Sequence, residues 1–250
     1  MRPRTVLAIG GSDPSGGAGI QADIKAIHAN GGYAMAAIAC LTVQNTQGVQ
    51  AVHAVDARFV ADQVRAVLED MPVDAVKIGM LGSSQIVEAV REALAGWHGP
   101  LVLDPVGVAK GGRTLQDAET LTALRDLARR ATLVTPNLDE AEFFCTGPRL
   151  LKGGHGQGAT LTDVLYGADD HEQARWSHPR FPSPHTHGTG CTLASALATR
   201  LAQGDRIVEA CDAAITYVQR QIQASAAGLG GGRGPLYQIP TSSGTHGPKT

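Results

Sequence analysis

Apolar segments of two kinds alternate along the first half of the chain. Thr5–Gly10 is short and continuously apolar, which is typical of a strand buried on both faces. In Phe59–Leu68, by contrast, Val60, Val64 and Val67 recur at helical spacing and fall on one face. This alternation predicts an α/β fold with a mostly parallel sheet that is covered by helices on both faces.

The same pattern predicts the individual elements. The expected strands are Thr5–Gly10, Tyr33–Val43, Ala75–Ile78, Leu101–Leu103, Thr132–Thr135 and a segment at Leu150–Leu151. The expected helices are Ile20–Ala29, Phe59–Leu68, a segment from Ile86 to Leu94, Asp117–Leu127, and two Ala-rich helices at Thr189–Gln203 and Arg206–Ala226. Leu161–Tyr166 and Gln173–Trp176, separated by GADD, predict a β-hairpin.

The length and composition fit one domain. The 250 residues, 43% of them apolar, are enough to bury a substantial core. We see no internal repeat and no linker that would divide the chain, so we expect a single domain over residues 1–240. Residues 241–250 end a Gly-, Pro- and Ser-rich tail, and we expect them to be disordered.

Charge and cysteine content exclude several classes of partner. The net charge is −2 and no basic run is present, so neither nucleic acid nor an anionic membrane is an expected partner. No apolar run approaches the about 18 residues of a membrane span, and the apolar run near the N-terminus is too short for a signal peptide. The four cysteines form no CxxC pair. We therefore expect reduced thiols and a cytoplasmic protein.

Gly-rich and polar residues follow the expected strands. Ligands of parallel sheets bind at the carboxyl ends of the strands, so a small-molecule pocket is expected at this edge. The residues at these ends are Gly10-Gly11, Gln44-Asn45, Gly79-Met80, Asp104-Pro105 and Pro136-Asn137.

The stretch HGTGCTLASALAT contains the most distinctive candidate site. Gly188 and Gly190 allow a tight turn, and apolar residues from Leu193 onward mark the helix that follows. We expect the amides of Gly190, Cys191 and Thr192 to open this helix and to attract an anion, such as a phosphoryl group in transfer. The same field would lower the pKa of Cys191, whose thiolate could accept a proton from an attacking hydroxyl. The alternative is a Gly-rich helix start with a small buried cysteine.

The first loop, GGSDPSGGAGIQAD, contains a GxGxxA match at Gly17–Ala22. It is weak evidence for a dinucleotide, because it does not follow the strand directly and no acidic residue ends the second strand. A P-loop is excluded, since the chain has no GxxxxGK[ST]. Asp23, one turn into the expected helix, either faces a ligand or complements the helix dipole.

Two acids and a lysine are expected at the same sheet edge. Asp104 ends a strand, and Glu140 follows Asn137 by three residues. Carboxylates suit Mg²⁺, which keeps several waters and bridges protein and phosphate oxygens. Glu140 could instead form a capping-box-like helix start. Lys152 either reaches a phosphate or is an ordinary solvated lysine. His185, His187 and Cys191 fit no usual zinc spacing, so a zinc site is not expected.

Seven of these segments occur in one order: AIGGSDPSGGAGIQAD, LTVQNTQGV, KIGML, LDPVGVAKGG, VTPNLDEAE, LLKGGH and HGTGCTLASALA. Together they resemble the hydroxymethylpyrimidine/phosphomethylpyrimidine kinases of thiamine biosynthesis, within the ribokinase superfamily. The resemblance runs from about Val6 to Pro235. It implies a three-layer α/β/α fold without a separate lid domain, usually assembled as a homodimer. It also implies a kinase that uses ATP and Mg²⁺ to phosphorylate 4-amino-5-hydroxymethyl-2-methylpyrimidine and then its monophosphate, giving the diphosphate.

The resemblance also implies residue roles. Gln44 matches the residue that binds the pyrimidine, and Asp23 matches a substrate-side aspartate. The other implied roles are backbone contacts to the ring from Gly11 and Val106, packing on its face by Met80, Mg²⁺-side acids at Asp104 and Glu140, groups near the ATP phosphates at Asn137 and Lys152, an anion hole at Gly188, Thr189, Gly190 and Cys191, and a base for the first phosphorylation at Cys191.

Two features depart from this family pattern. Leu138–Pro148 provides 11 residues for a parallel crossover that usually needs a dozen or more, so a helix and part of a strand are expected to be missing. Gly107 stands where the family commonly has a bulkier residue.

Three other functions are compatible with parts of the sequence. The nearest is a pyridoxal/pyridoxine kinase, since that substrate also carries a hydroxymethyl group. A non-catalytic pyrimidine-binding protein would follow if the short crossover impairs the nucleotide side. An NAD-dependent oxidoreductase has only the GAGIQA segment in its favour.

Overall fold

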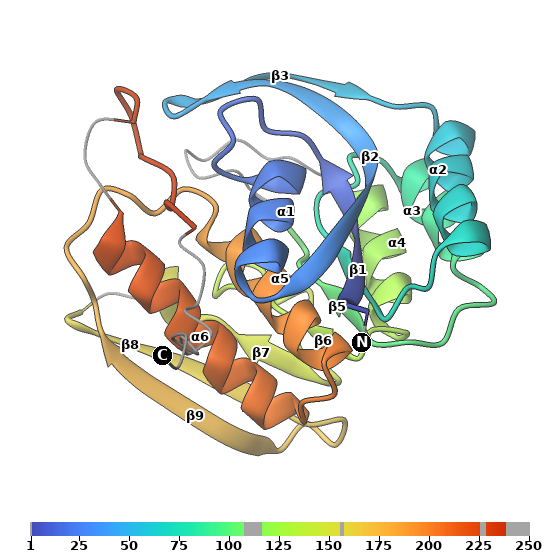
Figure 1. The fold of residues 1–250 in the computed structure, drawn as a ribbon. Helices are drawn as coiled ribbons and strands as arrows, with labels where there is room; N and C mark the ends of the chain where they lie inside the picture. Colours follow the sequence, from blue (N-terminus) through green and yellow to red (C-terminus); the bar gives the residue numbers. More distant parts are fainter. Residues whose placement is uncertain (1, 108–116, 156–157, 226–228, 239–250) are drawn as a thin grey trace, which may run out of the picture.

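The described strands form one sheet with helices on both faces (Figure 1). The computed structural model describes residues 2–107, 117–155, 158–225 and 229–238. Within these ranges the sheet has nine strands in the order β3-β2-β1-β4-β5-β6-β7-β8-β9. The strands from β2 to β7 run parallel, while β3, β8 and β9 are antiparallel to their neighbours. The expected mostly parallel α/β fold is confirmed.

The elements agree with the predicted ones to within a few residues, except for β3. The strands are β1 (Arg4–Gly11), β2 (Gly32–Asn45), β3 (Gly48–Ala54), β4 (Ala75–Ile78), β5 (Leu101–Leu103), β6 (Leu133–Val134), β7 (Arg149–Leu151), β8 (Thr160–Tyr166) and β9 (Glu172–Pro179). The helices are α1 (Gly19–Ala29), α2 (Ala57–Asp70), α3 (Ser84–Ala93), α4 (Ala118–Ala128), α5 (Thr189–Ala202) and α6 (Ile207–Ala224), with a 3₁₀ turn at Gly153–His155. The predicted disordered tail, residues 241–250, lies outside the described residues.

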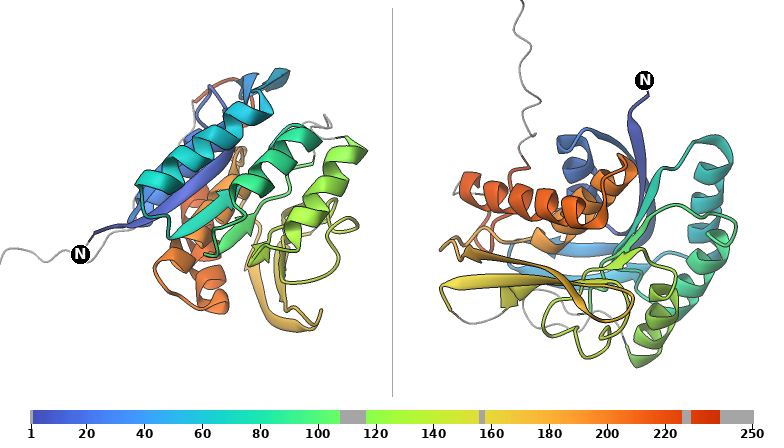
Figure 2. Two further views of the ribbon diagram at one scale, coloured as in Figure 1. Left: turned by 90° about the vertical axis from the view of Figure 1, so that its right-hand side faces the viewer. Right: turned by 90° about the horizontal axis from the view of Figure 1, so that it is seen from below.

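The sheet separates two apolar cores. Successive residues of β1 point to opposite faces: Val6 and Ala8 pack with α1, α5 and α6, whereas Leu7 and Ile9 pack with α2, α3 and α4. The latter three helices lie side by side in the left view of Figure 2. This two-sided burial explains why the central strands are continuously apolar in the sequence.

Strand β3 was missed because its side chains are mostly exposed. It pairs antiparallel with the end of β2, where Leu41 and Val43 are also exposed. A strand that buries neither face leaves no apolar alternation to recognise. The turn between the two strands ends at Gly48, which has a φ of +150°.

The short crossover is confirmed. Strand β6 continues into β7 through residues 135–148, all of which the structure describes, and this connection forms turns without a helix. Phe144 of this segment is 4% exposed and packs into the core beside α4. One aromatic side chain therefore covers the sheet here in place of a helix. The strands are also short, at two residues in β6 and three in β7.

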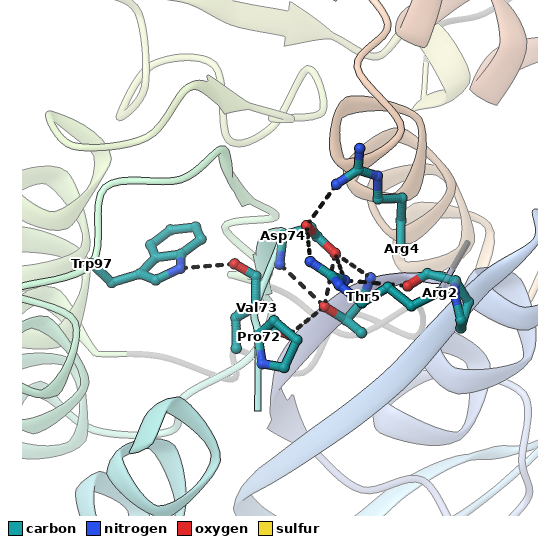
Figure 3. Close-up of polar contacts among 8 residues, drawn as sticks. Arg2, Arg4, Thr5, Pro72, Val73, Asp74 and Trp97 are labelled. Carbon is teal, nitrogen blue, oxygen red and sulfur yellow. Dashed lines mark hydrogen bonds and ion pairs between the residues drawn. The ribbon is translucent and has the colours of Figure 1, made fainter. Parts of the chain in front are cut away.

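At the sheet edge where β1 and β4 begin, Asp74 binds three neighbouring residues (Figure 3). Its carboxylate accepts hydrogen bonds from Arg2, from Arg4 and from the amide and hydroxyl of Thr5. The Arg2 contact, with the bonds from Thr5 and Arg4, holds the pKa of Asp74 well below its ordinary value, although burial acts against it. Ionised Asp74 therefore stabilises the folded chain.

Replacing Asp74 by asparagine is expected to lower the free energy of unfolding by about 2 kcal/mol near neutral pH. Because the folded pKa is depressed, the contribution is fully present above the unfolded pKa of about 3.9 and is lost as the pH falls below it. Denaturant unfolding at several pH values measures the difference. Asp62→Asn is the control, because its ion pairs with Arg58 and Arg65 are exposed and should contribute less than about 1 kcal/mol. A pH-independent effect of Asp74→Asn would contradict the assignment.

No helix within the described ranges is long and apolar enough to cross a membrane.

Candidate functional site

The expected loops meet at the edge of the sheet where the parallel strands end. A Cβ atom placed on Gly190 would lie 3.5 Å from both Asp104 Oδ2 and Lys152 Nζ, so the start of α5 adjoins the ends of β5 and β7. The amide nitrogen of Gln44 lies 3.3 Å from Nε2 of His187, the residue before Gly188. Gln44 and the start of α5 therefore lie at one place.

Gly188 is the N-cap of α5, with a φ of +79° that favours glycine. A Cβ at this position would lie 1.8 Å from the carbonyl oxygen of Gly17, so the first loop touches the start of the helix. The amide of Thr192 donates to the carbonyl of Gly188 at 2.9 Å. The expectation that the Thr192 amide is a free donor is therefore wrong, because this amide closes the first helical turn. The amides that precede this bond are those of Thr189, Gly190 and Cys191.

Cys191 is partly buried at the start of α5. Burial raises the pKa of its thiol to about 11, and the carboxylates of Asp23 and Asp104 act in the same direction. The ammonium group of Lys77 and the amide of Gly19 act against this rise. The predicted lowering of the Cys191 pKa is therefore wrong, because burial and two carboxylates outweigh the Lys77 ammonium group and the Gly19 amide.

Asp104 and Lys152 form an ion pair below the start of α5. Lys152 Nζ lies 2.8 Å from Asp104 Oδ1, which also accepts a hydrogen bond from the Thr135 hydroxyl at 3.0 Å. Although burial acts to raise it, Lys152 and Lys77 hold the pKa of Asp104 below its ordinary value. Although burial acts to lower it, Asp104 and Glu140 hold the pKa of Lys152 above its ordinary value. The pair is therefore charged, and Lys152 is not an ordinary solvated lysine.

Glu140 and Asn137 organise the turn after β6. One Glu140 oxygen accepts from the Gly107 amide at 3.1 Å, and the other accepts from the Asn137 amide at 3.0 Å. Asn137 Oδ1 in turn accepts from the Glu140 amide at 2.9 Å. This reciprocal pair is a capping box, but turns rather than a helix follow it. Burial raises the pKa of Glu140, with Asp104 acting in the same direction and Lys152 against it.

Asp23 does not reach the surface. Its side chain has no exposed area, and it accepts hydrogen bonds from Lys77 at 2.8 and 2.9 Å and from the Ser195 hydroxyl at 2.8 Å. The structure therefore contradicts a direct contact between Asp23 and a substrate, and Asp23 instead anchors Lys77. Although burial acts to lower it, Asp23 raises the pKa of the Lys77 ammonium above its ordinary value.

Three residues of this region were missed from the sequence: Asp13, Lys77 and His187, the last of which was considered only for a zinc site that was not expected. A lysine inside the apolar strand Ala75–Ile78 was a usable signal, since a buried ammonium needs a partner. Asp13 and His187 are 174 positions apart, and their contact has no local signature. His185, His187 and Cys191 form no metal-binding group, and the described residues contain no such group of three or more.

The remaining predicted ligand contacts, Gly11, Met80 and Val106, lie at the ends of β1, β4 and β5. A Cβ on Gly11 would lie 3.8 Å from the carbonyl oxygen of Met80, so these two chain segments are neighbours. A Cβ on Gly107 would meet ordinary contacts at 3.8 Å and beyond. The described residues therefore leave room for the bulkier residue that the family pattern has at this position.

Comparison with known proteins identifies the family of this chain. The sequence profile described as phosphomethylpyrimidine kinase matches residues 13–237. A hydroxymethylpyrimidine/phosphomethylpyrimidine kinase of Streptomyces coelicolor is 42% identical, and the alignment covers 94% of each protein. That alignment spans 259 positions, more than the 250 residues of this chain, so the relative contains residues that have no counterpart here.

Solved structures show the same fold. The phosphomethylpyrimidine kinase of Clostridium difficile superposes with a TM-score of 0.74 at 35% identity, covering 86% of this chain and 98% of that one. An ADP complex of Bacillus subtilis pyridoxal kinase gives a TM-score of 0.85 at 30% identity, covering 94% and 97%. These kinases are ribokinase-like, and the predicted ribokinase-like fold is confirmed. The alternative of an NAD-dependent oxidoreductase is wrong, because the profile match includes the Gly17–Ala22 segment that suggested it. The chain belongs to the phosphomethylpyrimidine kinase family.

Proposed function

We propose that this protein transfers a phosphoryl group from ATP to the hydroxymethyl group of 4-amino-5-hydroxymethyl-2-methylpyrimidine, and then a second one to the monophosphate, giving the diphosphate for thiamine biosynthesis. The observation that carries the proposal is the convergence at the start of α5. There, Gly190 adjoins the Asp104–Lys152 pair, and Gln44 lies beside the neighbouring His187.

Phosphoryl transfer depends on positioning and on stabilisation of negative charge. The amides of Thr189, Gly190 and Cys191 lie at the positive end of the α5 dipole, where they would stabilise negative charge on the transferred phosphoryl group. Lys152 adds a charged donor, and its ammonium is held by Asp104 rather than by solvent. In the first step the substrate hydroxyl attacks the γ-phosphorus, its proton passes to the thiolate form of Cys191, and ADP leaves.

The acidic residues fit a magnesium ion that is coordinated mostly by water and phosphate oxygens. Asp104 and Glu140 are close enough for each to influence Lys152, yet each Glu140 oxygen already accepts a backbone hydrogen bond. A carboxylate oxygen retains a second lone pair, so both acids can still bind a water molecule of a hydrated ion. Mg²⁺ does not require that all of its ligands come from the protein. Bound there, the ion would offset the charge of the ATP phosphates, and Asn137 would hold Glu140 in place.

Gln44 is the proposed recognition residue for the aminopyrimidine. A primary amide carries a donor and an acceptor side by side, which complements the amino group and ring nitrogen of the substrate. Gly11 and Val106 would contact the ring through their backbone, and Met80 would pack on its face.

Assembly and location remain part of the proposal. We propose a homodimer in the cytoplasm, acting on a small molecule without nucleic acid or membrane partners. The exposed apolar residues Leu41, Val43 and Val52 on β2 and β3 support a contact between subunits.

Pyridoxine phosphorylation is the second candidate activity. The higher TM-score to a pyridoxal kinase, 0.85 against 0.74, favours testing it. The third possibility, pyrimidine binding without catalysis, is less well supported, because the short crossover still brings Asn137, Glu140 and Lys152 together.

Mass spectrometry of the purified protein with the pyrimidine alcohol and Mg-ATP tests the proposal. We expect the monophosphate first and the diphosphate later, with ADP formed in step. In parallel reactions, we expect a higher kcat/KM for the pyrimidine than for pyridoxine. Efficient turnover of pyridoxine alone would replace the proposed substrate, and calorimetric binding of the pyrimidine without ADP release would identify a binding protein.

A further inference from the structure

Asp13 and His187 join the first loop to the start of α5, and neither has a role in the function proposed above. Asp13 is 1% exposed. One of its oxygens accepts from the amide and hydroxyl of Ser15 at 2.9 and 2.7 Å, and the other accepts from the Ala18 amide at 2.8 Å and from His187 Nε2 at 2.7 Å. An ionised carboxylate is an acceptor only, so His187 Nε2 must carry the hydrogen of the last bond.

The ionised state of Asp13 follows from these partners. Although burial acts to raise it, the hydrogen bonds from His187 and Ser15 hold the pKa of Asp13 below its ordinary value. The ring of His187 is also wedged in place, since a Cβ on Gly17 would lie 2.4 Å from its Cδ2. Both the position of the ring and the location of its hydrogen are therefore determined by the first loop.

This hydrogen determines which end of the Gln44 amide can face His187. The amide nitrogen lies 3.3 Å from His187 Nε2, and the amide oxygen lies 3.2 Å from the Thr42 hydroxyl, which also donates to the Ser12 carbonyl at 2.8 Å. In this arrangement two donors face each other at His187, and the single hydrogen of Thr42 serves two acceptors. Rotating the amide by half a turn exchanges its oxygen and nitrogen, which have nearly the same size. The Gln44 oxygen then faces the His187 hydrogen, which it shares with Asp13, so two donors no longer oppose each other, and Gln44 donates to Thr42.

We infer that Asp13 and His187 are positioning residues that hold the Gln44 amide with its oxygen toward His187, and that they thereby set which way round a substrate ring binds. This inference rests on the proposed function. In the proposed substrate the amino group and a ring nitrogen are neighbours, and the hydroxymethyl carbon adjoins the amino-bearing carbon. The amide oxygen accepts from the amino group, and the amide nitrogen donates to the ring nitrogen.

The direction of the amide consequently decides where the hydroxyl points. With the oxygen on the His187 side, the amino group and the adjoining hydroxymethyl group lie on that side, next to Gly188 and Cys191. The opposite orientation would pair with a ring that is turned over, and its hydroxymethyl group would point away from the start of α5. A substrate without the amino group, such as pyridoxine, would gain much less from this control.

A double-mutant cycle on Gln44 and His187, measured with the pyrimidine alcohol and with pyridoxine, tests the inference. We expect His187→Ala and Gln44→Ala each to raise KM for the pyrimidine about 10- to 100-fold with a smaller change in kcat. The double variant should be no worse than either single one, and the losses on pyridoxine should be much smaller. His187→Gln, which restores a donor at a similar reach, should recover part of the loss. His185→Ala, two residues earlier, is the control and should change neither constant appreciably.

Nitrogen NMR of the histidines gives a readout that does not depend on activity. The His187 resonance, assigned by its absence in His187→Ala, should show a protonated Nε2 in the folded protein. A deprotonated Nε2, or additive losses in the cycle, would overturn the inference. If the wild-type protein does not phosphorylate the pyrimidine, the proposed function fails, while the NMR result still decides whether His187 donates.

Discussion

Cys191→Ala is expected to slow phosphorylation of the pyrimidine alcohol by about 10²–10⁴-fold, the usual contribution of a general base. Phosphorylation of the monophosphate should change far less, because its acceptor is already an anionic oxygen and loses no proton. Single-turnover measurements of the two steps with saturating Mg-ATP separate the effects. Equal losses in both steps would contradict a base and would instead indicate that Cys191 positions the substrate.

The pH profile of the first step provides the matching test on the wild-type protein. Burial raises the pKa of Cys191 to about 11, so the thiol is protonated near neutral pH. A base acts in its deprotonated form, and below the pKa the thiolate fraction rises about tenfold per pH unit. The rate of the first step should therefore increase through the alkaline range, and Cys191→Ala should abolish that increase. A profile that is flat in the wild type would contradict the role.

Lys77→Met is expected to lower the free energy of unfolding by about 3–5 kcal/mol, the largest stability effect that we predict. Lys77 is 1% exposed, Asp23 has no exposed area, and their charged atoms lie 2.8 Å apart. Methionine fills a similar volume, but it leaves the Asp23 carboxylate buried without its counter-charge. Denaturant unfolding followed by circular dichroism measures the loss.

The double variant Asp23→Asn/Lys77→Met separates the lost charge from the lost packing. An uncharged amide still offers an oxygen to the Ser195 hydroxyl, so the double variant should be more stable than Lys77→Met by about 1–3 kcal/mol. Lys25→Met, on the same helix as Asp23 but exposed, should change stability by about 0.5 kcal/mol or less. If the single and double variants unfold alike, the buried pair is not what stabilises this region.

Local pattern predicted the elements that bury a regular face. The central strands, six helices and the β8–β9 hairpin were expected near their observed bounds, because burial on both faces or on one face leaves a periodic signal. Strand β3 gave no such signal because its residues are exposed on both faces. The β6–β7 crossover was recognised as short from its residue count alone, but the burial of Phe144 in place of a helix depends on how the neighbouring α4 packs.

The sequence predicted which chain segments form the candidate site, but it did not predict the pKa shifts and ion pairs within the site. Gln44, Asp104, Asn137, Glu140 and Lys152 were expected at one sheet edge, and the structure brings them there together with the start of α5. The family resemblance placed Asp23 on the substrate side, yet its side chain is fully buried and forms an ion pair with Lys77. The expected direction of the Cys191 pKa was wrong for a related reason: burial and two carboxylates on other elements outweigh the Lys77 ammonium group and the Gly19 amide.

By itself, the sequence determined the alternation of strands and helices, the edge at which ligands are expected and the family to which the chain belongs, because these properties depend on neighbouring residues and on ordered motifs. Only the tertiary structure decided which charges are buried together, which residues His187 contacts and which expected contacts are covered. The contact between Asp13 and His187 joins residues 174 positions apart. Interactions between residues so far apart in the sequence depend on how the helices and strands pack together. The pKa of each group therefore depends on its three-dimensional surroundings rather than on its neighbours in the sequence.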